Sequence, residues 1–246
     1  MADVQDQLKQ FWDRDAETYD RSPSHAASDP VEAAAWRAAL RRALPDPPAT
    51  VLDVGAGTGA MTMLAAELGY AVTALDLSEG MLAQARSKAR DRGLRVEFVV
   101  GSSTAPPPGP FDAVIERHVL WTTPDPVGAL SAWRRSAPAG RLVLFEGIWG
   151  RRDAVQRARD VAVELLQRLH RIPHDHHAEY DPDVLAQLPL ARLPSAEPLI
   201  RAVSDAGWRA PRIQRLLDVE WARRLQSPLG LAWLESIPQF ALVADA

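Results

Sequence analysis

The sequence predicts an α/β fold built on a doubly wound, mostly parallel sheet. Short β-branched runs alternate along the 246 residues with stretches of helical periodicity, as a parallel sheet covered by helices requires. The run at 49–54 leads into a glycine-rich turn, and the run at 70–76 ends in an acid, Asp76, followed by an N-cap serine, Ser78. A strand, a turn and the start of a helix therefore follow one another twice in the first third of the chain.

Taken in order, the patterns place strands near 49–54, 71–75, 96–100, 111–116 and 141–145. Helical spacing occupies 60–68, 79–92 and 127–137, and Pro138-Ala139-Gly140 then provides a stop signal. The C-terminal part continues with a helix at 195–206, a strand at about 212–219 and a closing strand at 240–244.

Two segments fall outside this alternation. Residues 1–43 include an amphipathic stretch at 31–43, and residues 149–193 form an insertion after the fifth strand. Both would hang over the carboxyl ends of the strands, the edge that holds the ligand in doubly wound sheets. We therefore expect an N-terminal helical lid at 1–43 and a main domain at 44–246, with 149–193 as a substrate-side insertion.

The glycine turn carries the first functional signal. Residues 49–59 read ATVLDVGAGTG, with one carboxylate, Asp53, two residues before Gly55. Such a turn brings backbone N–H groups close to a ligand, and the helix after it directs its positive dipole end to the same place. A pyrophosphate would be repelled by Asp53, so the turn favours a ligand with cationic groups. S-adenosylmethionine fits, since it carries a sulfonium, an ammonium and a carboxylate on one short chain.

Asp76 gives the second signal. A carboxylate at the tip of a second strand can accept both ribose hydroxyls of an adenosine, which is chemistry that NAD and S-adenosylmethionine sites share. Gly55, Gly57 and Ala60 also satisfy the loose dinucleotide pattern G-x-G-x-x-G/A. Asp53 therefore separates the two classes of site, and Asp76 indicates a nucleoside.

Residues 51–59, VLDVGAGTG, resemble the first signature of the class I S-adenosylmethionine-dependent methyltransferases. The segment W-x-x-x-A-x-x-Y-D at 12–20 and the stretch ERHVLW at 116–121 are similar to the small-molecule type, in particular the ubiquinone/menaquinone C-methyltransferase-like group. The resemblance covers most of 10–150. It implies a Rossmann-like methyltransferase sheet of seven strands whose last strand is antiparallel, and S-adenosylmethionine as the cofactor.

The resemblance also implies the cofactor-binding residues. Tyr19 would close on the methionine end, and Ser102 would bond the adenine where the family normally has an acid, which is a departure from the family pattern. The set expected at the cofactor is Tyr19, Asp53, Gly55, Ala56, Gly57, Gly59, Asp76, Leu77, Met81, Ser102, Ser103 and Arg117.

Residues at the ends of the fourth and fifth strands are candidates for removing a proton from an acceptor. His118 is the first choice as general base, and Glu116 and Glu146 are the second choices. A histidine at a strand end can equally cap the next helix or bond a carbonyl. Four tryptophans in lid or strand-end regions are candidate substrate walls, although a core position is the commoner fate of this residue: Trp12, Trp36, Trp121 and Trp149.

Composition excludes other classes of protein. The net charge of −4 gives no electrostatic footprint for nucleic acid or an anionic membrane. No run approaches the roughly 18 apolar residues of a membrane span, and the N-terminus lacks a signal-peptide pattern, so we expect a cytoplasmic protein. The chain has no cysteine, and the adjacent histidines of His174-Asp175-His176-His177 lack metal-ligand spacing, so no metal is expected.

The sequence therefore predicts a methyltransferase that acts on the O, N or C atom of a small molecule in secondary or cofactor metabolism. Three alternatives stay open. The first is an enzyme of the same fold that closes a ring from the aminobutyl chain of the cofactor, the second is a non-catalytic cofactor-binding partner, and the third is a dinucleotide oxidoreductase. The sequence does not indicate an oligomeric state.

Overall fold

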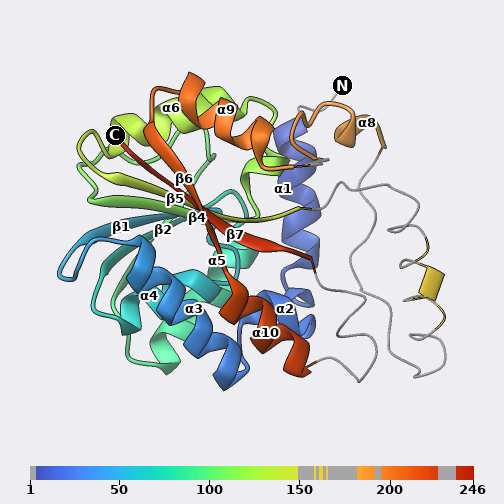
Figure 1. Cartoon of the computed structure of the whole chain (residues 1–246). Coiled ribbons are helices and arrows are strands. Elements are labelled where there is room, and N and C mark those ends of the chain that lie inside the picture. The colour runs from blue at the N-terminus through green and yellow to red at the C-terminus, as the bar shows by residue number, and fades with distance from the viewer. Residues whose placement is uncertain are drawn as a thin grey trace.

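The structure, a computed structural model, describes residues 4–148, 182–191, 195–226 and 237–246, with residues 158, 161, 162 and 165. Within these ranges the chain forms a seven-stranded sheet with helices on both faces (Figure 1). The strands are β1 (Thr50–Val54), β2 (Ala71–Asp76), β3 (Val96–Val100), β4 (Ala113–Arg117), β5 (Arg141–Gly147), β6 (Arg209–Arg215) and β7 (Gln239–Asp245).

The strand order is β3-β2-β1-β4-β5-β7-β6. Neighbouring strands from β3 to β5 are parallel, whereas β7 runs antiparallel to both β5 and β6. The expectation of a mostly parallel seven-stranded sheet with an antiparallel last strand is confirmed. The chain moves outward from β1 to β3 and then returns to β4, so the order reverses beside β1. In open α/β sheets, ligands bind outside the carboxyl ends of the strands at such a switch point.

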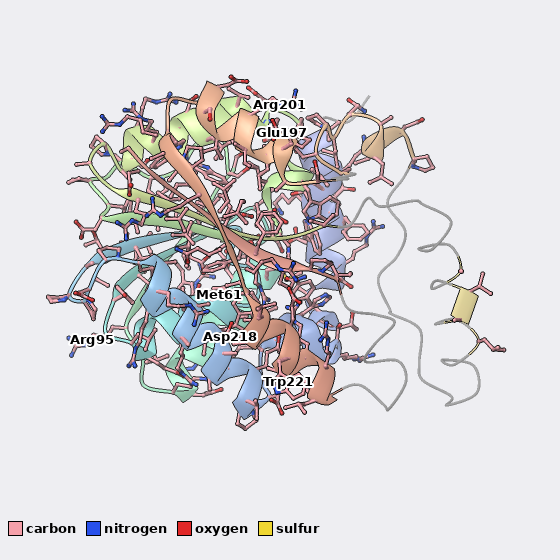
Figure 2. The ribbon with its side chains drawn as sticks, viewed as in Figure 1. Met61, Arg95, Glu197, Arg201, Asp218 and Trp221 are labelled. Atoms are coloured by element: carbon pink, nitrogen blue, oxygen red, sulfur yellow. The ribbon has the colours of Figure 1, made fainter. Side chains whose placement is uncertain are left out.

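Both faces of the sheet are buried, because alternate strand residues point to opposite sides. One face packs against α3 (Pro30–Ala43), α4 (Ala60–Glu67) and α10 (Leu217–Gln226), and its core includes Val51 and Phe145. The other face packs against α6 (Pro126–Ser136) and α9 (Glu197–Asp205), and its core includes Leu52 and Leu144. Helix α5 (Glu79–Asp91) contacts β2, β3 and α4. Figure 2 shows Glu197 and Arg201 on α9 and the exposed Trp221 on α10.

The predicted helices and strands agree with the observed ones to within two residues at each end, with one main exception. The strand expected at 212–219 is wrong in its second half, because β6 ends at Arg215 and α10 begins at Leu217. The acids Asp218 and Glu220 in the first turn favour a helix N-terminus. Burial of Val219 and Ala222 against the α3 side of the core then selects the helix.

The N-terminal segment forms α1 (Val4–Asp15), the 3₁₀ turn η1 (Tyr19–Arg21) and the short helix α2 (Pro23–Ala26), and Figure 1 shows α1 at the carboxyl ends of the strands. Two carboxylates attach it to the main domain. Asp13 accepts a hydrogen bond from the Ser78 hydroxyl at 2.5 Å. Asp20 accepts from the Thr58 hydroxyl at 2.6 Å and pairs with Lys88 at 2.5 Å.

Helix α3, which the sequence grouped with the lid, packs into the main core against α4 and α10. Most of the predicted insertion at 149–193, including the His174–His177 cluster, lies outside the described residues. Within 182–191, α8 (Pro182–Leu185) and the turn after it place Val184 and Leu188 against Leu8 of α1. None of the helices in the described ranges has the length and apolarity needed to cross a membrane.

Candidate functional site

The glycine turn after β1 adopts a left-handed backbone conformation at two positions that face the site. Gly55 has φ +64°, and a Cβ added to it would lie 2.2 Å from a methyl carbon of Val119. Gly57 has φ +56°, and a Cβ there would meet no atom of the described chain within 4 Å. Gly55 is therefore required by close packing against the segment after β4. Gly57 instead exposes bare backbone to an open space.

Both carboxylate oxygens of Asp76, at the end of β2, accept backbone hydrogen bonds. The backbone N–H of Gly57 donates to Oδ2 at 2.7 Å, and the backbone N–H of Ser78 donates to Oδ1 at 2.8 Å. Burial raises the pKa of Asp76, and the two N–H donors act in the opposite direction. Each carboxylate oxygen can accept a second hydrogen bond. The side chain lines a pocket, so it retains capacity for two hydroxyl donors there.

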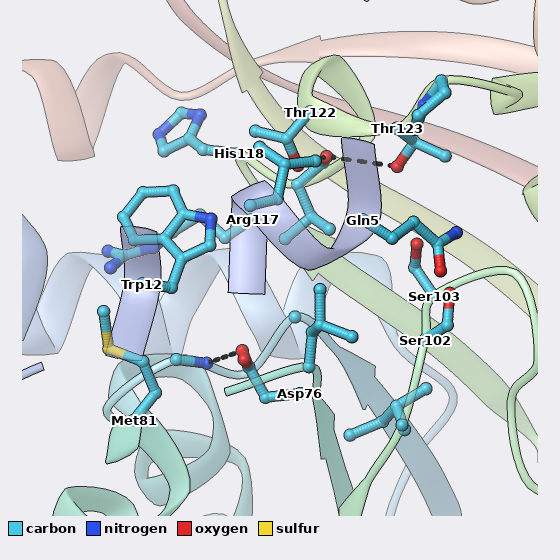
Figure 3. Close-up of a pocket in the computed structure, with 18 of the residues that line it drawn as sticks. Gln5, Trp12, Asp76, Met81, Ser102, Ser103, Arg117, His118, Thr122 and Thr123 are labelled. Atoms are coloured by element: carbon cyan, nitrogen blue, oxygen red, sulfur yellow. Dashed lines mark hydrogen bonds between the residues drawn. The ribbon is translucent and has the colours of Figure 1, made fainter. Parts of the chain in front are cut away.

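The pocket lies between the strand ends and the N-terminal segment. Figure 3 shows Asp76 between Ser102 and Ser103 on one side and Trp12 and Met81 on the other. Nine of the twelve residues expected at the cofactor line this pocket, namely Tyr19, Gly55, Gly57, Asp76, Leu77, Met81, Ser102, Ser103 and Arg117.

Three expected cofactor residues do not line the described pocket. Asp53 is 2% exposed, and its Oδ2 accepts a hydrogen bond from the Thr62 hydroxyl at 2.5 Å. It shares the α4-facing side of β1 with Val51, so it ties the strand to the helix instead of facing a cationic ligand. Burial raises the pKa of Asp53 to about 7. Ala56 donates its N–H to the Leu75 carbonyl within the turn, and Gly59 precedes α4 as its N-cap residue.

Of the three candidate bases, only His118 lines the pocket. Its Nδ1 lies 3.2 Å from Oε2 of Glu146, whose side chain is buried behind it on β5. Glu116 is also fully buried, and its Oε2 accepts hydrogen bonds from the N–H groups of Val119 and Leu120 at 2.7 and 3.3 Å. Glu116 thus caps the turn after β4, and Glu146 orients the imidazole.

Burial determines the protonation of Glu116, His118 and Glu146. Burial raises the pKa of Glu116 to about 8, and burial together with the charge of Glu116 raises the pKa of Glu146 well above its ordinary value. Burial and the positive charge of Arg117 hold the pKa of His118 well below 6.5. His118 is therefore neutral at neutral pH. A protonated Glu146 donates a hydrogen bond to Nδ1 and leaves the ring hydrogen on Nε2, whereas an ionised Glu146 accepts a hydrogen bond from Nδ1–H and leaves Nε2 as an acceptor.

The three tryptophans that the structure describes, among the four expected at the substrate, lie in different surroundings. Trp12 lines the pocket, and its ring lies edge to face with Tyr19 at a centroid distance of 5.9 Å. Trp36 is fully buried in the α3-side core, so its assignment as a substrate wall is wrong. Trp121 is partly buried against the α6-side core and does not line the described pocket. Trp149 lies outside the described residues.

The sequence missed several residues that line the pocket. Thr122, Thr123 and Pro124 follow the ERHVLW stretch directly, so their position in the sequence was a usable signal. No local pattern identifies Gln5 and Leu8 of α1, which reach the site only through the docking of that helix. The remaining lining residues are Leu75, Gly101 and Val119. The described ranges hold no cluster of three or more His, Asp or Glu side chains placed to bind a metal ion.

A family model and the relatives found by sequence similarity are both methyltransferases. Residues 52–144 match the family model described as a methyltransferase domain. A ubiquinone biosynthesis O-methyltransferase from Azotobacter vinelandii is 36% identical over 128 residues, which are 51% of this chain and 55% of that protein. A demethylmenaquinone methyltransferase from Tropheryma whipplei is 32% identical over 178 residues, which are 71% of this chain and 73% of that protein. The match with the Azotobacter protein thus spans little more than half of its length.

Solved structures share the fold at low identity. The [4+2]-cyclase SpnF aligns with a TM-score of 0.66 and 19% identity, covering 99% of this chain and 97% of that chain. The geranyl diphosphate C-methyltransferase from Streptomyces coelicolor aligns with a TM-score of 0.62 and 20% identity, covering 99% and 98%. At these identities the likeness concerns the fold alone.

Proposed function

Because this chain belongs to the class I S-adenosylmethionine-dependent methyltransferases, we propose that it methylates a small-molecule acceptor bound beside His118. The observation that carries the proposal is one pocket lined both by residues suited to a nucleoside, above all Asp76, and by a neutral histidine. Cofactor and acceptor groups could therefore meet in one enclosed space.

The residues present fit the cofactor that the family uses. Asp76 keeps acceptor capacity for two ribose hydroxyls, and Gly57 presents backbone that no side chain covers. Ser102 and Ser103 lie on the side where the base would bind, and Tyr19 and Arg117 would lie at the methionine end. When bound, S-adenosylmethionine supplies an electrophilic methyl group on its sulfur.

Residues of the chain hold the two reactants in position, exclude water from the pocket and remove the proton of the acceptor. Holding two reactants in line can supply on the order of 7–11 kcal/mol of barrier reduction. His118 would take the acceptor proton at Nε2 in the tautomer whose Nδ1–H donates to an ionised Glu146. The lid residues Trp12 and Tyr19 cover the pocket from the N-terminal side.

The relatives are named for O-methylation in ubiquinone biosynthesis and for methylation of demethylmenaquinone. We propose a phenolic or quinol ring as the first acceptor class to test. A phenolic hydroxyl gives up a proton on methylation, and a neutral imidazole on the pocket wall can accept it.

The experiment incubates the purified protein with S-adenosylmethionine and a panel of small phenols, and identifies the nucleoside product by mass spectrometry. S-adenosylhomocysteine with a methylated phenol supports the proposal, whereas methylthioadenosine would show chemistry on the aminobutyl chain. Thermal shift provides a second readout. A ligand specific for the native state adds about 2.7 kcal/mol at a hundredfold excess over Kd, so absence of stabilisation by S-adenosylhomocysteine would refute the site.

A further inference from the structure

Helix α1 presents one stripe of side chains to the pocket. Gln5, Leu8 and Trp12 all line the pocket, and their i, i+3, i+7 spacing puts them on one face of the helix. Because a helix rises about 1.5 Å per residue, Gln5 and Trp12 lie about 10 Å apart along its axis. Figure 3 shows Trp12 on one side of Asp76 and Gln5 on the other, toward Ser103. The stripe therefore reaches from one end of the pocket to the other.

Two contacts fix the position of α1 on the rest of the protein. Asp13 accepts a hydrogen bond from the Ser78 hydroxyl at 2.5 Å. Leu8 is buried and packs with Val184 of α8 in a small apolar cluster. Gln5 lies about one turn before Leu8 on the same face, so these contacts hold its backbone at a defined place beside the pocket.

The two ends of the pocket differ in charge. Arg117 lies at the end that Trp12 occupies (Figure 3). At the Gln5 end, the other polar side chains that line the pocket within the described ranges are neutral, namely Ser102, Ser103 and Thr123. A cofactor with a charged amino-acid chain and a neutral purine therefore places its base toward Gln5. The purine edge farthest from the ribose carries N1 and the N6 amino group, and this edge would face that end.

The loop after β3 uses most of its polar groups for its own turn. The Ser102 Oγ accepts a hydrogen bond from the backbone N–H of Thr104 at 3.2 Å and shares another, of 2.9 Å, with the Thr104 hydroxyl. The Ser103 carbonyl accepts from the Trp133 indole N–H at 2.6 Å. A hydroxyl has one donor and two acceptor positions, so Ser102 keeps one of them for a ligand. The side chains of this loop therefore offer single hydroxyl contacts, whereas the Gln5 carboxamide offers a donor and an acceptor side by side.

We propose that Gln5 recognises the purine base of the cofactor through its N1–N6 edge, and that the site therefore accepts a 6-oxo purine as well as adenine. This role of Gln5 rests on the proposed function. Adenine presents an acceptor at N1 and a donor at N6, which the amide N–H and the amide oxygen of Gln5 complement. Hypoxanthine presents the reverse pair, N1–H and O6. A half turn about the last side-chain bond of glutamine, whose torsion is roughly two-fold, matches this pair equally well.

The test measures three ligands by titration calorimetry: S-adenosylhomocysteine, its 1-deaza analogue, which lacks the N1 acceptor, and its 7-deaza analogue, which keeps the whole N1–N6 edge. The parent protein should bind the 1-deaza analogue roughly 3- to 10-fold more weakly than the other two, the effect of one neutral hydrogen bond. Gln5→Met should bind all three with the same affinity, because a thioether cannot donate a hydrogen bond. Gln10→Met is the matched control, since it changes an exposed glutamine of the same helix outside the pocket lining and should keep the preference.

The role of Gln5 is overturned if the parent protein does not disfavour the 1-deaza analogue, or if Gln5→Met still disfavours it. A purely structural role would give the second result, because it would weaken all three ligands equally and leave the preference unchanged. Loss of the preference in Ser103→Ala instead would assign recognition of the base to the loop after β3 and would also overturn the role of Gln5. Failure of the parent protein to bind S-adenosylhomocysteine at all would overturn the proposed function.

A fourth ligand, S-inosylhomocysteine, tests the acceptance of a 6-oxo purine. The parent protein should bind it within about threefold of S-adenosylhomocysteine, because the amide makes two neutral hydrogen bonds to either base. A penalty of about tenfold or more would overturn this acceptance. Methionine is about as good a helix former as glutamine, so Gln5→Met should keep α1. Gln5→Leu repeats the comparisons if the methionine variant does not fold.

Discussion

Substitution of Asp76 should lower both the affinity for the cofactor and the free energy of unfolding, and the two effects can be measured separately. Two ribose hydroxyls donating to a carboxylate correspond to about 1.5–3 kcal/mol for a charged acceptor, so Asp76→Ala should raise the Kd for S-adenosylhomocysteine by roughly 10- to 100-fold. The same variant deprives the N–H groups of Gly57 and Ser78 of their acceptor. The Ser78 N–H is buried, and an unsatisfied buried N–H costs about 1–3 kcal/mol, so the fold is not left intact.

Asp76→Asn is therefore the cleaner perturbation, since its amide oxygen still accepts from one of the two N–H groups. We expect about half of the loss in unfolding free energy seen for the alanine variant, with a similar loss of affinity because the charge is gone. Urea unfolding without ligand and calorimetry with S-adenosylhomocysteine measure the two effects. Asp112→Asn is the control, since Asp112 also accepts a backbone N–H, from Thr50 at 2.8 Å, but lies outside the pocket lining. A folded Asp76→Asn protein with unchanged Kd would refute the assignment to the ribose.

The remaining predictions concern the turn and the buried cluster. Gly55→Ala should abolish binding of S-adenosylhomocysteine in calorimetry, because its methyl group would collide with the segment after β4. Gly57→Ala should fold with only backbone strain of about 1–2 kcal/mol, because a Cβ there meets no protein atom. A Gly55→Ala protein that binds as tightly as the parent protein would contradict this. His118→Ala should lower kcat by about 10²–10⁴ with cofactor affinity unchanged, and Glu146→Gln by less. Because a base must be unprotonated and the pKa of His118 is lowered, the rising limb of the parent protein's pH–kcat profile should lie below pH 6.5 and disappear in His118→Ala; a limb that survives would exclude His118. The folded protein keeps a proton on Glu116 that the unfolded chain releases, so this group should lower the unfolding free energy between pH 4.5 and about 8, by at most about 1.4 kcal/mol per pH unit. Glu116→Gln should reduce the slope measured by denaturation at several pH values, while Asp53 and Glu146, whose pKa values are also raised, keep their part of it.

Local sequence was sufficient for the architecture and for the residues that we propose to bind the nucleoside. Strand alternation, the glycine turn and Asp76 are encoded by consecutive residues, and their consequences follow within one strand-turn-helix unit. The strand predicted at 212–219 shows the limit, because a short run such as 216–219 fits a strand or a helix equally well. Only packing against α3 selects between them.

What the sequence by itself determined is therefore the sheet, its ligand-binding edge and the class of cofactor. Tertiary structure decided which chemical groups meet at that edge. Glu146 stands behind His118 because β5 pairs with β4, Arg117 reaches the carbonyl of His25, and Trp36 is buried beneath Arg117 while Trp12 faces the pocket. The physical reason is that periodicity shows which side of an element is buried, whereas the partner across that side comes from a distant part of the chain.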